Sequence, residues 1–403
     1  MDLKKLSHGI LGGSFILLVT INIFFILNYF FHFAMARMLS IENYGILVTL
    51  YSLIYILAIF TESIQLVISK YTTEEKDKGK VKNLLKKSSK KAFRISFYIF
   101  IIFLLIGIIL SKLLMIDYPL IALTGLIIFS SFLLPITRGI LQGKKKFTTL
   151  GVNMISEAVV KLLSAILLVI VGMMVYGAIV ATLLGTYVSL LFSMNNLRDI
   201  LNSKEKNVKT PGIYGYSAPV FLIIIAILLF YSLDVIMAKI FFSPEVAGYY
   251  AVASMISKVI FFGTQPISRA MFPLTTDSKN KNNAAKILKT SFLILGGLIV
   301  IALLVVYLVP DLLIRIFAGR HIPEISKILI YPAIAVSFVS LSNLTALYKL
   351  SQNKTRGASF LLGFILLEVI LLSIFSSSLL SFSIAFLVSS IFLFLGTIVF
   401  LRK

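Results

Sequence analysis

Six acidic or basic side chains interrupt long apolar stretches of the chain, and their types could do chemistry there. They are Glu62, Glu157, Lys161, Asp234, Lys258 and Glu368. An ionisable group inside such a stretch is costly, so it usually faces a polar cavity or an oppositely charged partner. These positions are therefore the first candidates for a functional site.

Helical spacing groups some of these residues. Glu157 and Lys161 are four residues apart, which places them on one helical face. They either form an ion pair that neutralises itself or line a cavity together. Lys258 has no acidic residue within four positions and shares a face with Gln265 and Arg269. We expect Lys258 to line a polar path, and Arg269 either to share that path or to anchor the end of its helix.

Three other charged residues leave alternatives open. Asp234 lies about one turn before Lys239, and it either pairs with a basic residue of another helix or binds a coupling ion. Glu368 has no local cation, so a protonated acid and an interhelical ion pair are both open. Arg37 and Lys239 either contact nearby glutamates or receive an anion.

The elements that position these residues are membrane helices. Of the 403 residues, 59% are hydrophobic and 13% are charged, and the mean hydropathy is +1.01. A soluble domain carries about 25% charged residues, so this chain has too little polar surface for one. The uncharged runs predict an all-α polytopic membrane protein with about 12 transmembrane helices, at residues 8–36, 43–67, 94–111, 118–138, 148–171, 174–195, 212–238, 246–269, 290–309, 328–349, 357–375 and 379–401.

The basic residues predict an orientation. With the N-terminus in the cytoplasm, thirty of the 38 Lys and Arg residues fall on the cytoplasmic side of these spans, as the positive-inside rule requires. Both termini are thus expected to be cytoplasmic in a multi-pass protein of the cell membrane. This topology accounts for the net charge of +22 without a nucleic-acid partner. The basic segment 70–94 is expected to touch anionic lipid headgroups.

Several kinds of chemistry have no signal in the sequence. There is no Cys, and the three His residues make no zinc pattern. Residues 139–144 are one position short of a phosphate-binding loop and lack its Ser or Thr. The predicted external loops are too short to form a catalytic domain. We therefore expect no enzymatic activity, no catalytic residues, no cofactor and no resident metal.

Two halves of the chain repeat each other. Met35-Ala36-Arg37 followed by Ser40-Ile41-Glu42 resembles Met237-Ala238-Lys239 followed by Ser243-Pro244-Glu245, and Gly45 and Gly248 follow in matching positions. Six predicted helices separate the two, so both halves start from the same side as parallel repeats. The expected organisation is a six-helix lobe at 1–200, a cytoplasmic linker at 201–211 and a six-helix lobe at 212–403. Two such lobes are typical of alternating-access transporters.

Segments 36–45, 233–250 and 269–273, with the basic turn 141–144, resemble the polysaccharide-biosynthesis proteins. These are the Wzx-type oligosaccharide flippases of the multidrug/oligosaccharidyl-lipid/polysaccharide (MOP) exporter superfamily. The resemblance implies a monomer that moves a polyprenyl-(pyro)phosphate-linked oligosaccharide from the cytoplasmic to the outer leaflet.

On this resemblance, cationic groups along the path would bind the anionic pyrophosphate, and Glu157 would hold Lys161 until a phosphate competes for it. The predicted path residues are Lys161, Glu157, Lys258, Arg269 and Arg37. Asp234 and Glu368 would couple transport to H⁺ or Na⁺, and they keep open the alternative of an ion-coupled multidrug exporter of the MATE type.

Overall fold

The computed structural model describes residues 10–57, 59–208, 218–276, 281–352 and 357–401. Every element in these ranges is a helix, which confirms the expected all-α class. The extreme termini, and residues 209–211 of the expected linker, lie outside the described residues.

Ten of the described helices are long and apolar enough to cross a membrane. The second and eleventh expected spans are represented by two shorter apolar helices, Ile41–Leu57 and Phe360–Ile374. The expected fourth span is built from two consecutive helices, α6 (Tyr118–Gly125) and α7 (Ile127–Gly143). Within the described residues, helices lie at each of the twelve predicted positions and ten of these have span length, while twelve membrane crossings stay a prediction.

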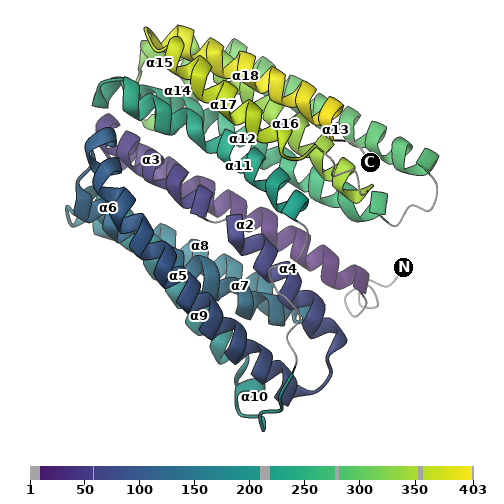
Figure 1. The fold of residues 1–403 in the computed structure, drawn as a ribbon. Coiled ribbons are helices and arrows are strands. Elements are labelled where there is room, and N and C mark those ends of the chain that lie inside the picture. The colour runs from purple at the N-terminus through teal and green to yellow at the C-terminus, as the bar shows by residue number, and fades with distance from the viewer. Residues whose placement is uncertain (1–9, 58, 209–217, 277–280, 353–356, 402–403) are drawn as a thin grey trace. The chain divides into compact units, whose positions relative to one another are not determined.

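The chain divides into two compact units. Unit 1 comprises Met1–Met35 and Leu57–Tyr216. In it α8 packs along α9, α4 along α7, and α5 along α7, as Figure 1 shows in blue and teal. Its helices are most of α2 (Ile10–Met38), α4 (Ile59–Glu74), α5 (Lys78–Leu114), α6, α7, α8 (Phe147–Ile170), α9 (Met174–Asn195) and α10 (Arg198–Leu201).

Unit 2 comprises Ala36–Ile56 and Ser217–Lys403. Here α12 packs along α16, α16 and α17 along α18, and α11 along α17. Its helices are α3 (Ile41–Leu57), α11 (Ala218–Phe241), α12 (Pro244–Thr276), α13 (Lys281–Leu308), α14 (Pro310–Ala318), α15 (Pro323–Ile328), α16 (Ile330–Ser351), α17 (Phe360–Ile374) and α18 (Leu379–Phe400).

Helix α3 departs from the expected lobes, because it belongs to unit 2 although it precedes most of unit 1 in the sequence. The Tyr44 ring meets Phe317 edge-on at 6.1 Å, and Tyr55 meets Tyr231 at 6.0 Å. A Cβ atom on Gly45 would lie 2.9 Å from the Cα atom of Gly248. Two glycines in matching repeat positions thus allow α3 and α12 to approach closely.

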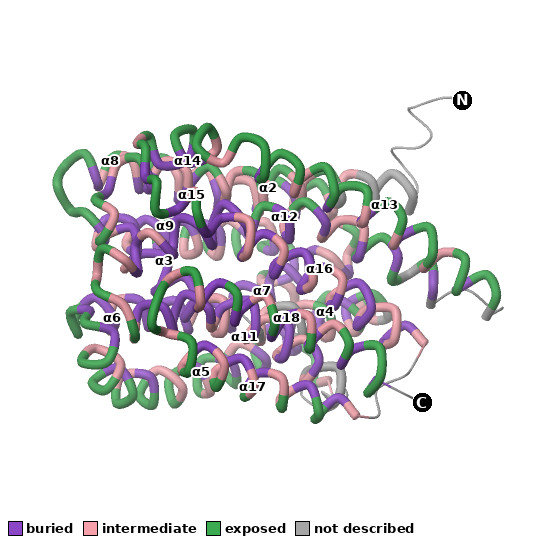
Figure 2. The backbone as a smooth tube through the Cα atoms, turned by 90° about the horizontal axis from the view of Figure 1, so that it is seen from above, coloured by how far each residue is buried: buried purple, intermediate pink, exposed green. Residues whose placement is uncertain are grey.

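The outer faces of the span helices are apolar. Exposed side chains on α5 include Ile102, Leu105 and Ile109, and those on α13 include Leu298, Ile301 and Leu304. Figure 2 shows green, exposed stretches along α5. In a membrane protein such faces meet lipid, since each backbone polar group is already satisfied within its helix.

The basic segment 70–94, which the sequence predicted as a connection, is mostly helical. Helix α4 continues to Glu74, and α5 begins at Lys78 after Asp77, whose side chain accepts a hydrogen bond from the Gly79 amide at 2.8 Å. A carboxylate in this position satisfies a free amide of the first turn. Helix α5 therefore carries the basic residues and the following apolar span as one continuous rod.

Candidate functional site

The most deeply buried ion pair of the described residues lies in unit 2. Lys258 Nζ is 3.1 Å from Asp234 Oδ1, and the two side chains are 1% and 0% exposed. Asp234 Oδ2 also accepts a hydrogen bond from the Ser254 hydroxyl at 2.7 Å, and the Tyr250 hydroxyl lies 3.4 Å away. Tyr250, Ser254 and Lys258 are spaced by four residues, so one face of α12 surrounds the Asp234 carboxylate of α11.

An aromatic ring lies beside the Lys258 ammonium. It lies 4.5 Å from the centre of the Tyr231 ring, within the range of a cation–π interaction. Tyr231 packs in turn against Phe261 at 4.8 Å and Tyr55 at 6.0 Å. The charge of Lys258 is thus held by one carboxylate and one ring.

Helix α17, which packs along α11, carries another buried carboxyl group, that of Glu368. Glu368 is 0% exposed, and neither of its carboxylate oxygens has a hydrogen-bond partner. An ionised carboxylate without partners is strongly disfavoured in such surroundings.

These contacts decide some of the open alternatives. Asp234 does pair with a basic residue of another helix, and that residue is Lys258. Arg269 lies eleven residues further along α12, about 16 Å at the rise of an α-helix, where it is exposed and donates to Gln265 Oε1 at 3.3 Å. The predicted common face of Lys258 and Arg269 therefore spans a buried and an exposed environment.

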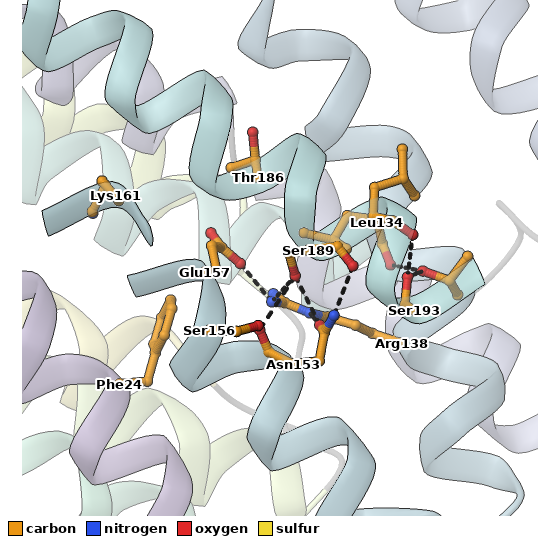
Figure 3. A network of polar contacts seen from close by, with 12 residues as sticks. Phe24, Leu134, Arg138, Asn153, Ser156, Glu157, Lys161, Thr186, Ser189 and Ser193 are labelled. Carbon is orange, nitrogen blue, oxygen red and sulfur yellow. Dashed lines mark hydrogen bonds and ion pairs between the residues drawn. The ribbon is translucent and has the colours of Figure 1, made fainter. Parts of the chain in front are cut away.

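Unit 1 contains a second buried polar network, centred on Arg138 of α7 (Figure 3). Arg138 Nε donates to Asn153 Oδ1 at 2.7 Å, and its terminal nitrogen contacts Glu157 Oε2 at 2.5 Å and Ser189 Oγ at 3.0 Å. The Asn153 amide donates to the Ser189 carbonyl at 2.7 Å. One guanidinium therefore ties α7, α8 and α9 together.

The interpretation of Glu157 as the holder of Lys161 needs correction. The Glu157 carboxylate pairs with Arg138, while the buried Lys161 ammonium donates to Asn28 Oδ1 of α2 and lies 4.7 Å from the Phe31 ring centre. The i, i+4 spacing identifies Lys161 as one possible partner of Glu157 on the same helix. In a packed bundle, side chains of adjacent helices compete for the same carboxylate.

Arg138 was not among the residues predicted for the site, because it lies where the predicted fourth span ends and a basic cytoplasmic connection follows. The structure places it inside α7, which ends only at Gly143. The sequence does contain a signal for this placement of Arg138. Gly143 followed by Lys144 is typical of a helix end, and a helix that ends there includes Arg138 in its last two turns.

Arg37 has structural contacts at the predicted outer exit. Its guanidinium donates to the Ile316 carbonyl at 2.8 and 3.0 Å, near the end of α14. In return, Arg320 donates to the Leu39 carbonyl at 2.7 Å, just after α2. The final carbonyls of a helix attract cations, so the two arginines stabilise each other's helix ends.

Outside the spans, an ionic cluster fastens segment 202–208 to the start of α5. Lys206 pairs with Asp77 at 2.6 Å, and Glu205 accepts from Asn83 at 2.7 Å and from Lys86 at 3.1 Å. The hydrogen bond from Lys206 lowers the pKa of Asp77, and those from Asn83 and Lys86 lower the pKa of Glu205. Within the described residues, no three His, Asp or Glu side chains gather as a metal site.

Solved structures reveal the class to which this fold belongs. An inward-facing multidrug resistance transporter of the MATE family, in the MOP superfamily, aligns with a TM-score of 0.72 and 14% identity, covering 92% of this chain and 93% of that one. An outward-facing MATE transporter gives a TM-score of 0.65 at 13% identity, with 96% and 94% covered. A MOP-superfamily transporter from Pyrococcus furiosus, described as having a binding pocket of reverse polarity, gives 0.64 at 12%, with 96% and 94% covered. The fold is that of the membrane transporters of this superfamily.

The sequence identifies the family. Residues 10–279 match the profile of the polysaccharide biosynthesis protein family. The chain therefore belongs to that family, as its short motifs predicted. None of the curated proteins matches the chain in sequence.

Proposed function

We propose that this chain is a flippase that moves a polyprenyl-(pyro)phosphate-linked oligosaccharide from the cytoplasmic to the outer leaflet of the cell membrane. It would work by alternating access, as a monomer with cytoplasmic termini. The observation that carries the proposal is the match to the polysaccharide biosynthesis family over residues 10–279. The basic excess on one side of the spans supports the orientation.

Buried cations support an anionic cargo. Arg138, Lys161 and Lys258 are basic residues buried within span helices. Arg138 and Lys258 are each paired with a carboxylate, whereas the Lys161 hydrogen bond goes to a neutral amide. The bond from Lys161 to Asn28 is one that a phosphate could replace, so we take Lys161 as the first residue of the proposed path, with Glu157, Lys258, Arg269 and Arg37 as the further proposed path residues.

The test is leaflet exchange in proteoliposomes with a fluorescent polyprenyl-pyrophosphate glycan. We expect exchange above empty liposomes, and we expect Lys161→Gln to reduce its initial rate by roughly tenfold or more, as for a lost charge-assisted hydrogen bond. Lys327→Gln, which removes an exposed lysine, is the matched control and should leave the rate unchanged.

A second candidate function is H⁺- or Na⁺-coupled export of small amphipathic cations. The observation that favours it is the buried pair of acidic residues Asp234 and Glu368. Gradient-driven efflux of an organic cation, combined with no exchange of the lipid-linked glycan, would contradict the flippase proposal and support this alternative.

A further inference from the structure

An apolar groove of about 740 Å³ lies between the last turns of α12 and the first half of α13, both in unit 2. Apolar side chains of both helices line it, among them Pro266, Ile267, Ala270, Leu274, Ile287 and Ile294. Pro266 lies inside α12, where proline disrupts the regular helix, and the groove opens beside it. Leu274 and Ile294 are exposed, so the groove faces the lipid that surrounds the span helices.

One end of the groove is basic. Lys286 lines it near the start of α13 and is exposed, and none of the described residues forms an ion pair with it. The sequence of α13 contains no acidic residue, and the start of the helix adds the positive end of its dipole. On the predicted orientation this end is cytoplasmic, where anionic lipids gather. The groove therefore combines apolar walls with an unoccupied cation at the level of the headgroups.

The length of the groove fits a lipid of one leaflet. Along α13 it extends from Asn283 to Ile294, which are eleven residues or about 16 Å apart at the rise of an α-helix. Half of a hydrocarbon core of about 30 Å is similar in depth. The chains of a phospholipid extend through one leaflet, whereas a polyprenyl chain is much longer. An anionic phospholipid thus matches the groove in length and in polarity.

We propose that this groove binds an anionic membrane phospholipid, with an acyl chain along its apolar walls and the phosphate at Lys286. The bound lipid fills the space between α12 and α13 and stabilises their packing. The site is apart from the Asp234–Lys258 pair, and the proposal does not depend on the cargo.

Native mass spectrometry of the full chain in a neutral detergent, with lipid titrated in, tests the headgroup contact. The wild type should bind phosphatidylglycerol more tightly than phosphatidylcholine. Lys286→Gln should weaken phosphatidylglycerol binding roughly fivefold, as expected for one lysine near an anionic headgroup. Lys289→Gln is the matched control, because Lys289 is exposed on the same helix but does not line the groove. Equal weakening by both variants, or equal affinity of the wild type for the two lipids, would overturn the proposal.

A groove-filling variant tests the chain contact in the same titration. Ala270→Phe places a ring in the groove and should weaken phosphatidylglycerol binding at least as much as Lys286→Gln does. Ala285→Phe, on α13 and outside the groove lining, is its control and should bind like the wild type. Both alanines are exposed, so both variants should fold, which thermal unfolding checks. Unchanged binding in Ala270→Phe would place the lipid elsewhere and overturn the proposal.

Competition distinguishes the phospholipid from other phosphates. Inorganic phosphate should not displace bound phosphatidylglycerol, because it has no apolar chain to fill the groove. Displacement by inorganic phosphate would overturn the proposal. So would displacement by polyprenyl phosphate at a lower concentration than phosphatidylglycerol itself requires, if Lys286→Gln abolished it, because the groove would then be a site for the carrier lipid of the proposed cargo.

Discussion

Arg138 in unit 1 and Lys258 in unit 2 are both buried cations in span helices, but their surroundings differ. Arg138 has one carboxylate partner, Glu157, and two neutral hydrogen-bond partners, Asn153 and Ser189, which it contacts through Nε and one terminal nitrogen. Lys258 has one carboxylate at contact distance, and helix α17, which packs along α11, carries a second buried carboxyl group, Glu368. The first cluster is balanced in charge, while the second carries one carboxyl group too many.

We expect this difference to give the two clusters different roles. A fully satisfied polar network rigidifies the helices that it joins, because any change leaves a buried group unpaired. A surplus carboxyl group without partners is instead favoured as the neutral acid, and it can ionise when a cation becomes available to it. We therefore expect the Arg138 network to hold α7, α8 and α9 in register, and the Lys258 cluster to respond to protons.

The largest expected effect comes from breaking the balanced network. Arg138→Met leaves Glu157 with a 14% exposed side chain and no cation in its place. Removal of one partner of a buried pair costs about 3–5 kcal/mol. Denaturant unfolding of the protein in nanodiscs would measure this loss. The double variant Arg138→Met, Glu157→Gln should recover part of it, and a single-variant loss below about 1 kcal/mol would contradict the scaffold role.

A smaller loss of stability is expected in unit 2, where the Glu368 carboxyl group can replace Asp234 as the counter-ion. Asp234→Asn should cost only about 1–3 kcal/mol, because Glu368 can ionise and serve as the counter-ion of Lys258. Adding Glu368→Gln to Asp234→Asn should raise the loss to about 3–5 kcal/mol. The same unfolding measurement applies. Equal losses of stability in the single and double variants would contradict the expectation that Glu368 replaces Asp234.

The close approach of Gly45 on α3 and Gly248 on α12 gives an apolar reference for these losses of stability. Gly248→Val should destabilise the protein by about 1–3 kcal/mol through overpacking, since even a Cβ atom there would lie 2.4 Å from the Ile41 carbonyl oxygen. Gly263→Ala, on the same helix with nothing within 4 Å of its added Cβ, is the matched control and should be neutral or slightly stabilising. Similar unfolding midpoints for the two variants would contradict the close contact.

The smallest effect is expected at the exposed ionic cluster on segment 202–208. Asp77 and Glu205 have lowered pKa values in the folded protein. Their contribution is present above the ordinary carboxyl pKa of about 4 and is lost as the pH falls through the lowered folded values. The protection of the amides of residues 202–208, measured as their hydrogen-exchange rates relative to the intrinsic rates at the same pH, should therefore be lower at pH 3 than at pH 7, and it should also be lowered in Asp77→Asn at pH 7.

High salt should also weaken this exposed cluster, because surface ion pairs are screened. The buried Asp234–Lys258 pair should not respond to salt in the same way. A buried pair as salt-sensitive as the exposed one would remove the distinction between the two environments.

Much of this protein was predictable along single helices. Within the described residues, uncharged runs located the ten helical segments of span length and the two shorter apolar helices, and Glu157, Lys161, Asp234, Lys258 and Glu368 were predicted because each is costly in an apolar segment. Their contacts were less predictable. The i, i+4 spacing favoured Glu157 with Lys161, but Arg138, which looked like part of a cytoplasmic connection, is the residue that pairs with Glu157.

The sequence by itself determined the membrane class, the helical segments, the basic asymmetry and the family. The first three follow from composition and from periodicity within one helix, which need no knowledge of neighbours, whereas the family follows from short motifs and from the profile match over residues 10–279. Only the tertiary structure decided that Asp234 holds Lys258, that Glu368 has no hydrogen-bond partner and that α3 belongs to unit 2. Contacts between helices depend on crossing angles and axial register, which arise from the packing of whole faces.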